Sequence, residues 1–262
     1  MAVGVHYFTD PACPWSWGIE PKVRKLFVEF GNSLQWTYVM GGLARDYPSG
    51  HEPLMTEWLD AADASTMPLD PRLWSEGPIA STYPACMAVK AAAEQGPDAG
   101  SAYLRALREG LLCFRRKLDT TEALVEEARR AGLDVQRFRI DLGSHAIVEA
   151  FGADLERTRT TPGVTLPTVV FSGDDGAVNA VQGFKPYDDY REVALEAGAT
   201  PVAGDPPGVL DAVKRFGRMA TAEIEAVCDL PAPRAGMELW QLAADWKLRP
   251  VRILAGYLWE PA

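Results

Sequence analysis

The hydrophobic residues at the start of the chain follow a strand–helix–strand order. Residues Val3–Thr9 are rich in strand-forming side chains, and an Asp-Pro pair ends that run. Apolar residues then recur at three- and four-residue spacing up to Gly31, which predicts one helix beginning near Pro14. A second short strand is predicted at Leu34–Val39. This order is typical of two parallel strands joined by a right-handed crossover helix.

The middle of the chain has a mainly helical pattern. Between about residues 52 and 150, three clear helices are expected, over residues 83–95, 101–114 and 121–130. Strand patterns return at Pro167–Phe171 and Ala177–Val181, separated by Gly-Asp-Asp-Gly, which predicts a β-hairpin. A helix over residues 187–197 follows the hairpin. The two strand-containing halves are therefore separated by a long helical segment.

The last part of the chain follows a segment rich in proline and glycine, residues 201–208, which is typical of a linker. Three helices are expected beyond it, over residues 209–219, 221–228 and 238–247. We therefore expect three units, namely a domain made of residues 1–50 and 151–200, an inserted helical subdomain of residues 51–150, and a helical C-terminal extension of residues 201–262.

The charge balance excludes some classes of function. The 262 residues include 26 Lys+Arg and 36 Asp+Glu, a net charge of −10, whereas nucleic-acid binding requires clustered basic residues. Residues 205–262 have the periodicity of a helix–turn–helix but hold seven basic against eight acidic residues, so their tryptophans are expected to pack on the main domain. With no long apolar run and no leader pattern, we expect a cytoplasmic protein that binds neither nucleic acid nor membrane.

Four cysteines, Cys13, Cys86, Cys113 and Cys228, lie far apart, and no two form a C-x-x-C pair. Neither a metal site nor a disulfide-stapled fold is therefore expected. Three of them are expected to be buried thiols. Cys13 differs because it precedes Pro14, where a helix is predicted to begin. A sulfur at that position faces free backbone N–H groups and the positive end of the helix dipole, so we expect a pKa below the free value of about 8.5.

The residues around Cys13 resemble those of a known family. The string T-D-P-A-C-P-W-S-W-G-I-E-P, the helical insertion and a later Leu-Pro-Thr are similar to the DsbA form of the thioredoxin fold, especially its cytoplasmic FrnE-like oxidoreductases. The resemblance covers about residues 1–200 and implies a thioredoxin-like α/β fold, β-α-β followed by β-β-α. It also implies that Cys13 is the attacking thiol and that Pro167 is a cis-proline facing it. Leu166 would then offer its backbone to a substrate strand, with Trp15 and Thr168 as further substrate contacts.

Position 16 departs from the family pattern, because Ser16 stands where these oxidoreductases usually carry a second cysteine. A hydroxyl group is barely ionised near neutral pH and cannot resolve a mixed disulfide. We therefore predict a thiol–disulfide oxidoreductase that works through Cys13 alone, with Ser16 hydrogen-bonded to the sulfur. No bound cofactor is expected, and an external thiol such as glutathione or mycothiol would resolve the adduct. The expected substrate is a disulfide or thiol-conjugated protein, or a small-molecule thiol.

Two alternatives stay open. Kappa-class glutathione transferases are similar in fold and carry S-P-Y-S-W at this turn, which matches Ser16 and Trp17 but not Cys13. That resemblance implies a transferase or isomerase that uses a low-molecular-weight thiol. The other alternative is a redox-inactive adaptor that presents a partner to a protease, which fits the missing second cysteine. A papain-like set of Cys13, His145 and Asn179 is disfavoured, because the local sequence signature of those proteases is absent.

Overall fold

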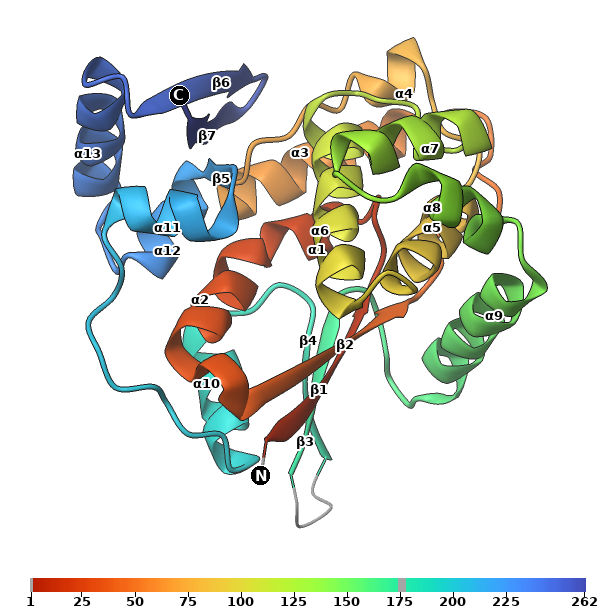
Figure 1. Cartoon of the computed structure of the whole chain (residues 1–262), viewed down its shortest axis with the longest axis horizontal. Helices are drawn as coiled ribbons and strands as arrows, with labels where there is room; N and C mark the ends of the chain where they lie inside the picture. Colours follow the sequence, from red (N-terminus) through yellow and green to blue (C-terminus); the bar gives the residue numbers. More distant parts are fainter. Residues whose placement is uncertain (1, 174–177) are drawn as a thin grey trace.

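A four-stranded mixed sheet forms the centre of the computed structural model, which describes residues 2–173 and 178–262 (Figure 1). Its strands are β1 (Val3–Thr9), β2 (Leu34–Met40), β3 (Thr168–Ser172) and β4 (Val178–Gln182), in the order β2-β1-β3-β4. β1 and β2 are parallel, whereas β3 is antiparallel to both β1 and β4. The predicted crossover and hairpin are confirmed. Residues 174–177 of the predicted turn and strand lie outside the described residues.

The predicted first helix is divided into α1 (Pro14–Gly18) and α2 (Glu20–Phe30). Pro21 has no N–H to donate to the carbonyl of Trp17 four residues earlier, so the first helix ends and the second begins at Ile19. α2 and α10 (Tyr187–Glu196) pack on the sheet around a core that includes Val5, Leu26, Phe30, Phe171 and Tyr190.

The inserted segment is helical, as the sequence predicts. Its elements are α3 (Glu52–Ser65), α4 (Leu73–Glu76), α5 (Tyr83–Ala93), α6 (Pro97–Arg108), a π-helical turn η2 (Glu109–Cys113), α7 (Thr121–Arg130), α8 (Val135–Leu142) and α9 (His145–Thr160). The alanine-rich α5 contacts α6, α7, α8 and α9, since small side chains allow close approach. At one such contact, a Cβ on Gly100 would lie 2.9 Å from the Cβ of Ala93.

The C-terminal extension contains strands that the sequence analysis did not predict. The three expected helices are present as α11 (Val209–Phe216), α12 (Thr221–Val227) and α13 (Ala232–Ala244), although α13 begins and ends earlier than predicted. β5 (Met219–Ala220) lies between α11 and α12, and β6 (Leu248–Ile253) and β7 (Gly256–Pro261) follow α13. The strands form a second sheet in the order β5-β7-β6. This helix–strand–helix–helix–hairpin order is that of a winged helix–turn–helix. β5 is only two residues long and β6 contains Pro250, which weakens the sequence signal of both.

The tryptophans of this extension do not pack on the main domain as expected. Trp259 is buried, but in the extension's own core with Val213, Ile224 and Leu239. Trp240 and Trp246 are 50% and 87% exposed. The extension instead contacts the main domain mainly through α12 against α2.

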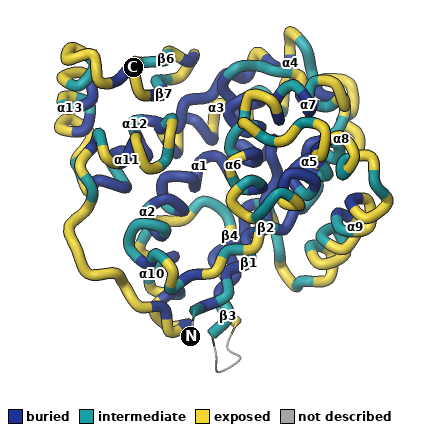
Figure 2. Tube along the Cα trace, viewed as in Figure 1, coloured by how far each residue is buried: buried dark blue, intermediate teal, exposed yellow. Residues whose placement is uncertain are grey.

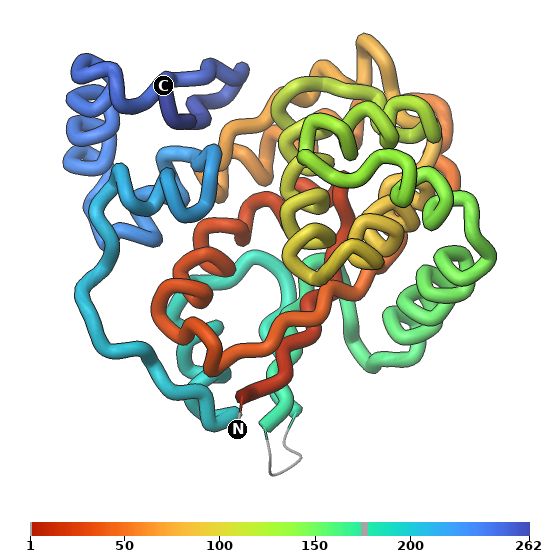
Figure 3. The backbone as a smooth tube through the Cα atoms, in the orientation of Figure 1, coloured from red at the N-terminus to blue at the C-terminus, as the bar shows by residue number. Residues whose placement is uncertain are grey.

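The course of the chain places the insertion and the C-terminal extension on different sides of the sheet domain (Figure 3). Residues 201–208 contain no helix or strand, as predicted, and most of them are exposed (Figure 2). Among the helices of the described residues, none is long and apolar enough to cross a membrane.

Candidate functional site

Cys13 lies between the end of β1 and the start of α1, as the sequence predicts. It occupies the N-cap position, and its Sγ accepts a hydrogen bond from the backbone N–H of Ser16 at 3.4 Å. Pro14 follows at the first helical position, where a missing N–H removes no hydrogen bond from the helix. The sulfur therefore faces the free backbone donors of a short helix.

Burial nevertheless reverses the expected effect on the thiol. Cys13 is only 2% exposed, and this burial raises its pKa to about 11. Hydrogen bonding from Ser16 lowers the pKa and the nearby charge of Asp10 raises it, but both effects are smaller than that of burial. The expectation of a pKa below the free value is thus wrong, because removing the thiolate from water outweighs the helix terminus.

The Leu166–Pro167 peptide bond is cis, and it lies beside the cysteine. The Cys13 Sγ is 3.9 Å from the carbonyl oxygen of Leu166. Gly41, just after β2, leaves room for this approach, since a Cβ there would lie 2.7 Å from a methyl carbon of Leu166. Thr168 is buried, and its hydroxyl donates to the Thr165 carbonyl at 2.6 Å. Leu166 is therefore the residue of this loop whose backbone reaches the sulfur.

The other two residues of the motif have different surroundings. Trp15 is partly exposed, and its ring lies 6.1 Å from that of Phe184. The Lys22 ammonium lies 3.2 Å from the centre of the Phe184 ring, and burial lowers the pKa of Lys22 to about 8. Ser16 is fully buried, and its carbonyl accepts a hydrogen bond from the Tyr7 hydroxyl at 3.1 Å. Trp15 is therefore the motif side chain that a bound molecule could touch.

Asp10 also belongs to this site, although in the sequence the Asp-Pro pair indicates only the end of a strand. It is fully buried, and its carboxylate accepts hydrogen bonds from the backbone N–H groups of Ala12 at 2.8 Å and Leu43 at 2.7 Å. The Thr82 hydroxyl and the Cys86 thiol also donate to it, at 2.8 and 3.2 Å. Burial raises the pKa of Asp10, while these donors lower it. Asp10 therefore ties the Cys13 loop to the segment after β2 and to α5.

The other cysteines are buried free thiols, as predicted for Cys86, Cys113 and Cys228. Burial raises the pKa of each. The Cys113 thiol donates to the carbonyl of Pro68 at 3.2 Å. Within residues 2–173 and 178–262, no group of three or more His, Cys, Asp or Glu side chains could hold a metal ion.

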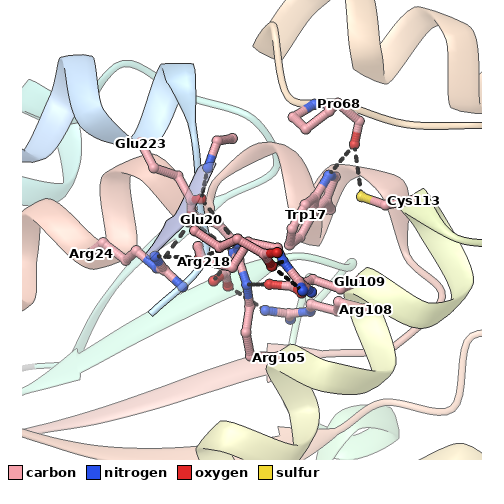
Figure 4. Close-up of polar contacts among 12 residues, drawn as sticks. Trp17, Glu20, Arg24, Pro68, Arg105, Arg108, Glu109, Cys113, Arg218 and Glu223 are labelled. Carbon is pink, nitrogen blue, oxygen red and sulfur yellow. Dashed lines mark hydrogen bonds and ion pairs between the residues drawn. The ribbon is translucent and has the colours of Figure 1, made fainter. Parts of the chain in front are cut away.

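A buried network of arginines and glutamates lies next to the cysteine site and joins all three parts of the chain (Figure 4). Arg105 of α6 contacts Glu109 at 2.7 Å, Glu223 of α12 at 2.7 Å and Glu20 of α2 at 3.4 Å. Its guanidinium also lies 4.3 Å from the centre of the Trp17 ring. Burial alone would raise the pKa of Glu223, but the charges of Arg105 and Arg24 hold it below its ordinary value. Sequence patterns gave no sign of this network, because its members are far apart along the chain.

Comparison with known proteins agrees with this fold. A family model described as thioredoxin matches residues 6–192, so the chain belongs to the thioredoxin family. Two curated relatives are similar to it over nearly its whole length, and both are named ClpXP adapter protein SpxH. The one from Halalkalibacterium halodurans is 33% identical, covering 98% of this chain and 88% of the relative. The one from Bacillus subtilis is 29% identical with the same coverage.

Solved structures confirm the predicted DsbA-like form of the fold. The cytosolic disulfide reductase DsbM from Pseudomonas aeruginosa superimposes with a TM-score of 0.62 at 20% identity, covering 74% of this chain and 98% of its own. The same enzyme with GSH gives a TM-score of 0.60 at 19% identity, covering 74% and 99%. At this level of identity the likeness shows the shared fold.

Proposed function

We propose that this chain is an adaptor that delivers a protein client to a ClpXP-type protease, and that its thioredoxin-like site has lost efficient redox catalysis. The similarity to relatives named as ClpXP adapters extends over 98% of the chain, and so includes the C-terminal extension. The observation that carries the proposal is the state of Cys13, which is buried beside a serine at the position of the usual second cysteine.

The effect on reactivity is large. Burial raises the pKa of the Cys13 thiol to about 11, so at pH 7 a much smaller fraction is thiolate than in a free cysteine, which is ionised to a few per cent. The thiolate is the species that attacks disulfides, so exchange through Cys13 is slow. The remaining cysteines are buried and cannot act in its place without movement of the fold.

The C-terminal extension has the surface expected of an interaction unit. Met237 and Trp240 on α13 are 69% and 50% exposed, and Trp246 just beyond α13 is 87% exposed. Exposed tryptophan and methionine side chains are enriched at protein interfaces. A DNA-reading helix at this position would instead present basic side chains.

A protease trap tests the adaptor role. ClpXP made from a proteolytically inactive ClpP retains the proteins that ClpX unfolds, and its captured proteins are identified by mass spectrometry with and without this chain. We expect at least one protein to be captured only when the chain is present, and the Cys13→Ala variant to support the same capture. Identical captured sets with and without the chain would contradict the proposal.

A second candidate, monothiol exchange, is supported by the carbonyl of Leu166 lying 3.9 Å from the Cys13 sulfur. Such an arrangement can hold a substrate strand across a mixed disulfide. Intact-mass analysis after incubation with glutathione disulfide or mycothiol disulfide tests it. Rapid addition of one thiol at Cys13 near pH 7 would favour the exchange enzyme over the adaptor.

A further inference from the structure

Trp246, just after the end of α13, has a backbone conformation that does not suit a tryptophan. Its φ of 56° lies in the left-handed region. Its N–H donates to the carbonyl of Ala243 at 3.1 Å, and the N–H of Lys247 donates to the carbonyl of Leu242 at 2.9 Å. These two bonds form a Schellman motif, in which glycine is the usual left-handed residue because a Cβ there lies too close to the following carbonyl. A tryptophan at this position therefore strains the end of the helix.

The Trp246 side chain contributes little to packing within the chain. Among the described residues, it is the most exposed of the large apolar side chains, at 87%. Strained backbone of this kind is concentrated at functional sites, and tryptophan is enriched at the centres of protein interfaces. The strain at Trp246 and its exposure together indicate that its ring contacts another molecule.

An apolar groove of about 400 Å³ lies directly beside this ring. Trp246 forms part of its lining, together with Ala243, Leu248, Pro250 and Pro261. At about 30 Å³ for each water molecule, the groove has room for about a dozen of them, which is enough for an indole ring. Figure 1 shows the end of α13, β6 and the C-terminus close together at the periphery of the molecule. A projecting ring and an empty groove thus occur on the same surface.

Pro250 restricts the kind of contact that this surface can make. β6 is an edge strand of the second sheet, and an exposed edge can in general pair with a strand of another chain. Pro250 lies within β6 and has no N–H to donate, so it opposes such pairing. The contact is therefore expected to use side chains, with an apolar group entering the groove.

The charge distribution favours a second copy of this chain as the partner. Residues 205–262 hold seven of the 26 basic and eight of the 36 acidic residues, so all but one unit of the net charge of −10 lies elsewhere. Two copies repel each other over the rest of their surfaces much more than over this extension. Asp245 and Lys247, on either side of Trp246, form an ion pair at 3.5 Å. Across a two-fold axis, each of these charges can meet the opposite charge of the other copy.

A two-fold contact requires a surface that is complementary to itself, and a ring beside an empty groove meets that requirement. We propose that two copies of the chain associate through their C-terminal extensions, with Trp246 of each copy entering the groove of the other. Met237 and Trp240 do not line the groove and stay exposed in such a pair. This inference goes beyond the proposed adaptor function and does not depend on it.

Sedimentation equilibrium of the full chain, between about 1 and 200 µM, tests the proposal. The mass of the wild type is expected to rise from 28.6 kDa towards twice that value. Trp246→Gly is expected to raise the dissociation constant at least about a hundredfold, because both copies lose a ring that contributes about tenfold or more. Glycine suits the left-handed position, so the urea midpoint of this variant should not fall. Loss of association in Trp246→Gly is thereby separated from loss of the fold.

Two further variants and a salt series make the test specific. Ile140→Ala is the matched control, since Ile140 is 73% exposed on α8 and lies outside the groove, and it should leave association unchanged. Ala243→Glu places a charge in the groove while keeping Trp246, and it should also be monomeric, with its fold checked by circular dichroism. Raising NaCl from about 50 to 500 mM should strengthen association, because it screens the repulsion between two acidic chains.

Several results would overturn the proposal. A wild type that stays monomeric at about 200 µM would do so, as would association that Trp246→Gly leaves unchanged or that Ile140→Ala weakens equally. Masses that grow beyond two chains would show head-to-tail contacts in place of a two-fold pair. A monomeric wild type whose Trp246→Gly variant no longer supports client capture in the protease trap would assign the ring to the client instead.

Discussion

Replacing Asp10 with asparagine is expected to make the protein less stable and Cys13 more reactive. The carboxylate accepts four hydrogen bonds, three at Oδ2 and one at Oδ1. An asparagine can place its oxygen where the three donors converge, but its NH₂ group then faces the N–H of Ala12. One buried donor loses its acceptor, which costs about 1–3 kcal/mol of unfolding free energy.

The same substitution removes a negative charge that raises the pKa of Cys13, although burial, the larger cause, remains. The thiolate fraction at a given pH therefore increases, and so does the rate of alkylation. Urea unfolding measures the stability, and iodoacetamide labelling followed by peptide mass spectrometry measures the rate at Cys13 between pH 6 and pH 10.

Asp154→Asn is the matched control. Asp154 accepts a hydrogen bond from the backbone N–H of Met40 at 2.9 Å and pairs with Lys90 at 2.9 Å, so its loss also reduces stability. Asp154 is not among the groups that shift the Cys13 pKa. The alkylation rate of Cys13 should therefore be unchanged in Asp154→Asn. If Asp10→Asn left the Cys13 rate unchanged, or if both variants raised it equally, the assigned effect of the Asp10 charge would be refuted.

Three further outcomes are expected from the buried network and the motif. Arg105→Met removes one side of several buried ion pairs and should lower the unfolding free energy by about 3–5 kcal/mol in urea; a loss below about 1 kcal/mol would contradict this. The pKa of Glu223 is lower in the folded state than its ordinary value of about 4.5. The ionised carboxylate therefore stabilises the fold fully above about pH 4.5, and this stabilisation is lost as the pH falls through the lower pKa of the folded state. The backbone amides of α12 should therefore exchange hydrogen faster on acidification, and Glu223→Gln should abolish that change. Ser16→Cys should form a disulfide with Cys13 under mild oxidation, and retention of both free thiols would show that the motif is misplaced.

Local sequence patterns were sufficient to predict the strands and helices of the sheet domain. The alternation in Val3–Thr9 and the helical spacing after Pro14 predicted β1 and the crossover, since both depend on residues close in sequence. The break at Ile19 was also encoded locally, by Pro21, but the continuous apolar spacing concealed it. In the C-terminal extension, β5 is only two residues long and β6 contains Pro250, so the sequence pattern of a strand is weak in both.

The chemistry at Cys13 could not be predicted in the same way. The position of Cys13 at a helix start was visible in the sequence, and the hydrogen bond from the Ser16 backbone does lower the pKa of the thiol. The larger effect is burial, to which Leu166 and its loop contribute from a distant part of the chain. Asp10 was missed for the same reason, because its donors Leu43 and Thr82 belong to distant segments.

The adaptor function is tested most directly by measuring how fast a client identified in the trap is degraded by active ClpXP. The rate is compared without the chain, with the wild type and with Cys13→Ala. If the chain is an adaptor that acts without redox chemistry at Cys13, the wild-type chain accelerates degradation and Cys13→Ala accelerates it equally. No acceleration by the wild type, or loss of acceleration in Cys13→Ala, would show that it is not.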